Sequence, residues 1–400
     1  MPNSTNIQDN AGEYLGNLNG RYDGLNEALN LPKIDPKVFN TEKDDYGQGQ
    51  SLFMGQDPGL FDTVNLQHPQ LRTIFREQKQ LDWDENEVPF DSCNAEFKTR
   101  PTVIAGRMID TLAWQWEADS IAARSMYALM APFITNSELS RAWCKVTEVE
   151  HLHAATYSEI VRTSFDNPQE VLKQVLGNVE AINRMSVIGD ALKHAYRISH
   201  ELALGMRKRE DIETYDAAMM ATTAFLALER VQFMASFAIT FANANQGMFV
   251  PIGKSVQRIC QDEFEIHVQL DKYILDYEMS LPCGKAFFAR NKENIQKLFE
   301  DVIQCEFRWI EYMDFKSQPM VGLNDQMLRD WVVFCAADAL AVFGLKPDHP
   351  VPRQSPLAFM EDWIDVSKIQ SSPQEEKGRT QYKNNMLRDN LGETVMVADF

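Results

Sequence analysis

The sequence predicts an all-α protein, a bundle of long helices around a metal-binding core. Apolar residues recur at helical spacing from about His68 to about Phe343, and no segment of this stretch alternates as a strand would. Two Glu/His pairs and two isolated acids lie inside the same stretch. A helical bundle that binds two metal ions draws its ligands from four helices in this way.

The apolar pattern divides into eight helical segments at residues that commonly begin or end helices. Thr135 with Glu138 forms a capping-box pattern before the third segment. Pro168 and Pro251 begin the fourth and sixth segments, and Pro282 separates the sixth from the seventh. The predicted ranges are 68–82, 101–130, 136–164, 168–205, 212–244, 252–280, 287–314 and 324–343.

Both ends of the chain differ from this helical stretch. Residues 1–60 are rich in Asn, Gly and Asp and predict an irregular N-terminal arm. Four prolines between residues 347 and 356 break any helix, and residues 366–400 are polar until a short apolar and acidic end. The sequence therefore predicts one helical domain over 61–346, followed by a flexible C-terminal tail over 347–400.

The composition is that of a globular protein with a strongly negative net charge. The charge of −19 argues against a nucleic acid or an anionic membrane as the partner. The most apolar segment, 217–242, is interrupted by Glu229, Arg230 and Gln232, which favours a buried core helix over a membrane span. Scattered cysteines without a CxxC pair and a polar N-terminus favour the cytoplasm as the location.

Six residues of the helical stretch are predicted to bind two metal ions. The first Glu/His pair has a spacing of three residues and the second a spacing of four, and both spacings keep two side chains on one helix face. Carboxylate oxygen and imidazole nitrogen suit iron or manganese. The predicted ligands are, in chain order, Asp119, Glu150, His153, Glu229, Glu263 and His267.

Each ligand also has a simpler interpretation. A carboxylate in an apolar helix must be paired, hydrogen-bonded or bound to metal, so Glu229 could instead form a salt bridge with a core arginine. Asp119 could be an exposed acid. A single Glu-x-x-His is common by chance, but two pairs with isolated acids in apolar segments are much rarer. His151 points away from His153 and is predicted to lie at the surface or behind the ligands.

The spacing of the second pair predicts a local irregularity in its helix. Phe264, three residues before His267, cannot bind a metal, and Glu265 faces away. An extra residue in a helix is often absorbed as a π-bulge at a functional site. We therefore predict a π-bulge near 262–266.

Tyr157 lies one turn beyond His153, on the predicted metal-facing side. Phe233 and Phe237 would surround it with apolar surface, although core packing explains both equally well. A phenol beside an oxidising metal pair in a dry pocket could be oxidised, and its radical would be kept from quenching.

These residues resemble the small, radical-generating subunit of class I ribonucleotide reductase, a family with a ferritin-like fold. The resemblance covers about residues 52–400. It rests on the segments DSIAARS (119–125), EHLHAATYSEI (150–160), LERVQFMASF (228–237) and DEFEIH (262–267), together with QKQLDW (78–83) and the tail segment QSSPQE (370–375).

The resemblance implies a di-iron centre, with manganese possible, that oxidises Tyr157 to a stable radical. The first three ligands would bind one ion and the last three the other, with the two paired glutamates able to bridge. Asp262 would hydrogen-bond between His153 and Trp83. Trp83 and the tail residue Tyr382 would then relay the oxidising equivalent to a cysteine in a separate large subunit, which reduces ribonucleotides to deoxyribonucleotides.

The resemblance further implies a homodimer that docks on the large subunit through its C-terminal tail. The chain shows no glycine-rich phosphate loop and no basic cluster, so we expect the nucleotide to bind elsewhere. Two alternatives remain open. A ferritin-like di-metal oxidase or hydroxylase would need the same ligands but not Trp83, Tyr382 or a docking tail. An iron-binding or storage protein would be smaller and would assemble into a shell.

Overall fold

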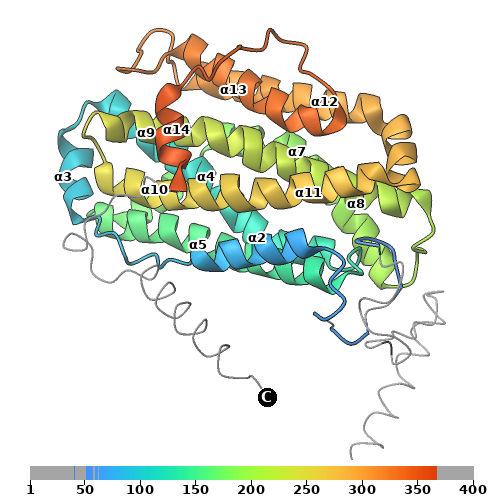
Figure 1. Ribbon diagram of the computed structural model, residues 1–400. Helices are drawn as coiled ribbons and strands as arrows, with labels where there is room; N and C mark the ends of the chain where they lie inside the picture. Colours follow the sequence, from blue (N-terminus) through green and yellow to red (C-terminus); the bar gives the residue numbers. More distant parts are fainter. Residues whose placement is uncertain (1–39, 41–50, 57–58, 62, 367–400) are drawn as a thin grey trace, which may run out of the picture.

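The computed structural model describes residue 40 and residues 51–56, 59–61 and 63–366. Within these residues the structure is helical, and extended pairing is limited to isolated bridges such as the one between Phe53 and Ile134. The predicted all-α fold class is confirmed (Figure 1).

Thirteen numbered α-helices lie in the described part of the chain. Four of them are joined in pairs by π turns: η1 (Leu228–Phe233) joins α8 to α9, and η2 (Glu263–His267) joins α10 to α11. The helices are α2 (Pro69–Gln80), α3 (Asp91–Thr99), α4 (Thr102–Met130), α5 (Ser137–Ser164), α6 (Pro168–Leu176), α7 (Val179–Ala203), α8 (Ile212–Ala227), α9 (Met234–Asn245), α10 (Val250–Asp262), α11 (Val268–Ser280), α12 (Pro282–Tyr312), α13 (Asp325–Leu340) and α14 (Ala358–Ile364).

The bundle is built around four helical rods: α4, α5, α8–η1–α9 and α10–η2–α11. Helix α4 packs on α5 and α9, α10 packs on α5, and the two π turns contact each other. Helix α2 covers α5 and α11, whereas α12 and α13 cover the opposite side (Figure 1). The predicted ligands therefore lie on elements that pack together in the centre of the bundle.

The rod α8–η1–α9 is the most apolar part of the described chain. Among the described helices only Ile212–Asn245 has the length and composition of a membrane span, and its most apolar window is entirely buried inside the protein. A helix that is apolar on all sides and enclosed by other helices is the core of a bundle.

Two predicted helix starts are wrong in detail. The cap of α5 is Asn136, whose side chain accepts a hydrogen bond from the Leu139 N–H at 3.0 Å. The predicted cap, Thr135, instead donates its hydroxyl to the Ser51 carbonyl. The helix break predicted at Pro282 is present, since α11 ends at Ser280, but the next helix, predicted from residue 287, already begins at Pro282, where the missing N–H costs nothing.

The segment predicted as one helix over 168–205 is two helices. Helix α6 ends before Gly177, and the Asn178 side chain caps α7 by accepting the Ala181 N–H at 3.1 Å. Helices α3 and α14 were not predicted. Both are short, with nine and seven residues, so the helical period is hard to detect in them.

Packing against the bundle extends beyond the predicted domain at both ends. In the predicted N-terminal arm, Leu52 is buried, and its carbonyl accepts the Thr135 N–H at 3.0 Å. After residue 346, helix α14 packs on α9 and α10, with Met360 buried and the Trp363 ring stacked 4.5 Å from that of Phe241. Residues 367–400 of the predicted tail lie outside the described residues.

Candidate metal centre

The structure brings all six predicted ligands together in the middle of the four rods. None of the six is more than 3% exposed. They form two groups in which the possible ligand atoms lie within 4.8 Å of one another, and two glutamates belong to both groups. The groups are Asp119, Glu150, His153 and Glu263, and Glu150, Glu229, Glu263 and His267.

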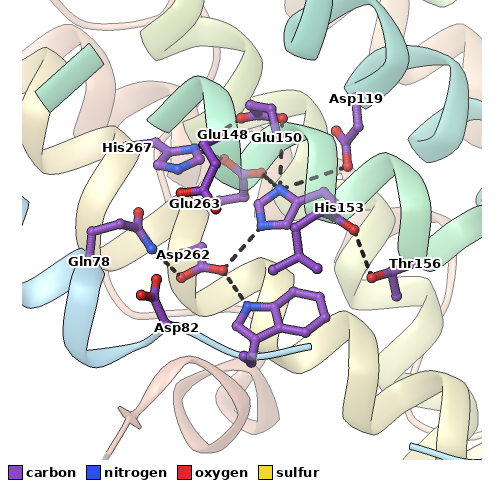
Figure 2. A network of polar contacts seen from close by, with 12 residues as sticks. Gln78, Asp82, Asp119, Glu148, Glu150, His153, Thr156, Asp262, Glu263 and His267 are labelled. Carbon is purple, nitrogen blue, oxygen red and sulfur yellow. Dashed lines mark hydrogen bonds and ion pairs between the residues drawn. The ribbon is translucent and has the colours of Figure 1, made fainter. Parts of the chain in front are cut away.

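The shared carboxylates lie between the two histidines (Figure 2). Glu263 has one oxygen 3.0 Å from His153 Nδ1 and the other 2.7 Å from His267 Nδ1. Glu150 lies 3.7 Å from His153 Nδ1 and 3.1 Å from His267 Nδ1. Two carboxylates that each face both imidazoles are arranged as bridging ligands for a pair of metal ions.

The two outer carboxylates lack the hydrogen bonds that normally accompany burial, although Asp119 Oδ2 lies 3.9 Å from His153 Nδ1. Neither oxygen of Asp119 or Glu229 has a hydrogen-bond partner among the described residues. The adjacent arginine, Arg230, pairs with Asp338 at 2.6 Å instead. The simpler interpretations, an exposed Asp119 and a salt-bridged Glu229, are therefore wrong. A buried carboxylate without a hydrogen bond either keeps a proton or needs a cation beside it.

The charges of the cluster point to the same conclusion. Burial and then the neighbouring carboxylates raise the pKa of Asp119 and Glu229 well above the ordinary range. Burial alone would lower the pKa of His267, but Glu263 and Glu150 raise it to about 10. Without a cation the cluster therefore holds extra protons. Two divalent ions would balance four carboxylates and displace those protons.

The predicted π-bulge in the second Glu/His pair is confirmed. Glu263–His267 is a π turn, whose wider i→i+5 repeat absorbs the extra residue. The Glu263 and His267 side chains meet across this turn, with Glu263 Oε2 2.7 Å from His267 Nδ1. The second π turn, at Leu228–Phe233, was not predicted and carries Glu229. Its only signal in the sequence was a group of three polar residues in an otherwise apolar helix.

A series of hydrogen bonds leads from the first ligand group towards the surface. Asp262 Oδ2 accepts the Trp83 indole N–H at 2.7 Å and lies 3.2 Å from His153 Nε2. The Trp83 and His153 rings are nearly parallel, with centroids 6.1 Å apart. Gln78, which sequence reasoning missed, donates to the other oxygen of Asp262 at 2.7 Å (Figure 2). Trp83 lines a pocket of about 160 Å³ at the outer end of this series of hydrogen bonds.

Tyr157 is buried next to the acids of the cluster. It is 1% exposed, and its hydroxyl has no hydrogen-bond partner among the described residues. Burial, then Asp119, Glu263 and Glu150, raise its pKa well above the ordinary value, so the phenol stays protonated. Phe233 and Phe237 are fully buried and stack 5.7 Å apart.

Two other predicted positions lie apart from the cluster. His151 is exposed, and its Nδ1 contacts the Thr147 carbonyl, as a surface residue would. Tyr382 lies outside the described residues.

Comparisons with known proteins agree on one family. Residues 60–356 match the family described as ribonucleotide reductase, small chain. The beta subunits of ribonucleoside-diphosphate reductase from Buchnera aphidicola of Acyrthosiphon pisum and from Haemophilus influenzae are each 24% identical, over 84% of this chain and 92% of the relative.

Solved structures show the same fold. The ribonucleotide reductase R2 subunit from Clostridium botulinum aligns with a TM-score of 0.71 and 18% identity, over 83% of this chain and 99% of that one. The Streptococcus sanguinis dimanganese(II)-NrdF aligns with a TM-score of 0.60 and 14% identity, over 76% and 99%.

Proposed function

The chain belongs to the small-chain family of ribonucleotide reductase, and from this premise we propose that its two ligand groups would hold a metal pair, which with oxygen would supply the oxidising power that converts Tyr157 to a radical. As a small subunit it acts with a large subunit in ribonucleotide reduction. The observation that carries the proposal is the pair of carboxylates shared by two histidines beside a buried, protonated phenol.

The six ligands have separate tasks in this proposal. Asp119 and His153 would hold one ion, Glu229 and His267 would hold the other, and Glu150 and Glu263, which belong to both groups, would be shared between the two. Each imidazole presents Nδ1 to the cluster. Asp262 holds His153 Nε2 and so sets the ring orientation, as carboxylates behind metal-binding histidines do. When bound, the metal pair supplies the oxidising power.

The surroundings of Tyr157 suit a long-lived radical. Oxidation of a phenol releases its hydroxyl proton. Asp119, the carboxylate with the largest effect on the pKa of Tyr157, would accept that proton. Tyr157 is 1% exposed, and Phe233 and Phe237 are fully buried, so bulk water is kept from the phenol. Its hydroxyl has no hydrogen-bond partner among the described residues, so no neighbour is in place to return a proton to the radical.

The route out of the centre runs through Trp83 in the proposal. The bonds from His153 to Asp262 and from Asp262 to Trp83 connect the first group with the pocket at the surface. Tyr382, on the C-terminal tail, would continue the path to the large subunit, and the tail over 347–400 would dock there. This connection favours radical transfer over a self-contained oxidase, hydroxylase or storage protein, which would not need it.

The proposal also concerns which metals the site binds. Carboxylate and imidazole ligands accept both iron and manganese, and one structural neighbour is named as a dimanganese protein. We infer two iron ions, with manganese possible, in a homodimer located in the cytoplasm. The domain over 61–346 would hold the centre.

Paramagnetic resonance of the reconstituted protein tests the proposal directly. The metal-free protein is loaded with ferrous iron and exposed to oxygen, and a sharp tyrosyl radical signal is expected. Tyr157→Phe should abolish the signal and leave two bound metals per chain. A signal that survives this substitution would show that another residue carries the radical.

A further inference from the structure

A buried arginine on α7 joins the helix that carries Glu229 to helix α12. Arg184 is 2% exposed, and its guanidinium makes two bonds to Glu306, at 2.7 Å and 2.6 Å. Glu306 is fully buried. The two charges are therefore matched inside the protein, at a place that contains no predicted metal ligand.

The remaining donors of Arg184 hold the π turn η1 and the first turn of α9. One donates to the Gln232 carbonyl at 2.9 Å, and another to the Ser236 hydroxyl at 2.7 Å. The Gln232 amide donates in return to the Arg184 carbonyl at 3.0 Å and to Glu306 at 3.1 Å. These bonds fix the backbone of the turn three residues after Glu229.

Arg184 also contacts the helix that carries Asp119. Its guanidinium carbon lies 3.7 Å from the centroid of the Trp114 ring, on α4. The Trp114 ring lies 5.0 Å from that of Phe233, which belongs to η1. Arg184 thus contacts both α4, which carries Asp119, and η1, which carries Glu229.

Stability alone is a poor reason for this pair. Removing two charges from water is costly, and apolar residues of similar volume often replace a buried ion pair without loss of stability. A π turn, in contrast, is a rare helix form that is found mostly at functional sites. A rare form persists only when surrounding contacts hold it.

We propose that Arg184 and Glu306 are a positioning pair that keeps η1 in its π form and so directs Glu229 to the second ligand group. The proposal rests on the proposed function for the identity of that group as a metal site. It assigns Arg184 no contact with the metal. Its effect on the site passes through the Gln232 carbonyl and the Ser236 hydroxyl.

Two variants separate positioning from stability. Arg184→Lys keeps a charge for Glu306 but cannot span Glu306, Gln232 and Ser236 together. The double variant R184M/E306M removes the charges as a pair and fills the space with apolar atoms. The matched control is Arg107→Met, since Arg107 is also buried but binds the Met313 and Asp314 carbonyls, away from η1.

The measurement is anaerobic titration of the metal-free protein with Fe(II), together with thermal unfolding. The unaltered chain should bind two ions. Both Arg184 variants should bind the first ion normally and the second about tenfold or more weakly, the effect expected of a lost supporting contact. The Arg107 variant should unfold at a lower temperature and still bind both ions normally.

The outcomes are distinct. Normal binding of the second ion by either folded Arg184 variant would overturn the proposal, and so would an equal weakening in the Arg107 variant. If the unaltered chain binds fewer than two ions, the proposed function fails and this inference fails with it. Weakening confined to the second ion, in the Arg184 variants only, supports the pair as a positioning device.

Discussion

Replacing Glu229 with glutamine is expected to stabilise the metal-free protein while it removes a ligand of the second metal. Glu229 is 1% exposed, and neither of its oxygens has a hydrogen-bond partner among the described residues. After burial, the carboxylates of Glu263 and Glu150 are the main causes of its raised pKa. Glutamine has nearly the same shape and nothing to ionise, so the substitution removes the free-energy cost of keeping a proton on this carboxyl when the protein folds.

The ordinary pKa of 4.5 sets the size of the effect. At pH 7 the folded protein must keep a proton on this carboxyl that the unfolded chain releases. About 2.5 pH units at roughly 1.36 kcal/mol each give a ceiling of about 3 kcal/mol. Because the folded pKa is the raised one, stability falls as the pH rises above 4.5. The gain from glutamine should therefore be near zero at pH 4.5 and about 1–3 kcal/mol at pH 7.

Thermal unfolding of the metal-free proteins at pH 5 and pH 7 measures this difference. For a domain of this size, 1 kcal/mol corresponds to about 1–2 °C in Tm. The control is Glu306→Gln, because Glu306 is equally buried but paired with Arg184. Breaking that pair should destabilise the protein by about 3–5 kcal/mol. With Fe(II) present, the order of the Glu229 variant and the unaltered chain should reverse, since binding stabilises the folded state.

Two results of the Tm measurement would contradict the prediction for Glu229→Gln. If Glu229→Gln lowers the Tm of the metal-free protein at pH 7, the carboxylate has a stabilising partner inside the protein. If the change in Tm is the same at both pH values, its proton is not the cause.

Two further predictions concern the tail and a second buried acid. Removing residues 394–400 should weaken binding to the large subunit by about tenfold or more. Tyr382→Phe should preserve both this binding and the Tyr157 radical but stop deoxyribonucleotide formation. Continued turnover of the Tyr382 variant would exclude this residue from the path. Burial raises the pKa of Glu278 to about 7, so its contribution to stability is lost as the pH rises from 4.5 through 7. Glu278→Gln should therefore raise the Tm at pH 8 by the equivalent of up to about 3 kcal/mol and have little effect near pH 4.5, and equal shifts would contradict this.

The three ligands of the first group that precede Glu263 could be found from the sequence because they sit on regular helices. Glu150 and His153 are three residues apart on α5, and Asp119 lies on α4. For regular helices, spacing alone decides which side chains share a face. Glu229 could be found for another reason, since a carboxylate in an apolar helix is conspicuous wherever it points.

Contacts between distant segments could not be found in the same way. Gln78 is 184 residues from Asp262, and Arg184 is 122 residues from Glu306. Nothing local marks either pair. The choice of Asn136 over Thr135 as the cap of α5 has the same origin, because the Thr135 hydroxyl is engaged by the segment at Ser51.

The two ligand groups differ in what holds them in place. The unshared residues of the first group come from regular helices, whereas Glu229 and His267 both come from π turns that contact each other. The η2 turn could be predicted from the sequence because the second Glu/His pair has one residue more than the first, and such an extra residue is often absorbed as a π-bulge. The η1 turn carries a single ligand, so no spacing can disclose it, and its form depends on partners from α7, α12 and α13. The geometry of the second group is therefore a property of the tertiary structure, and that of the first is largely a property of its helices.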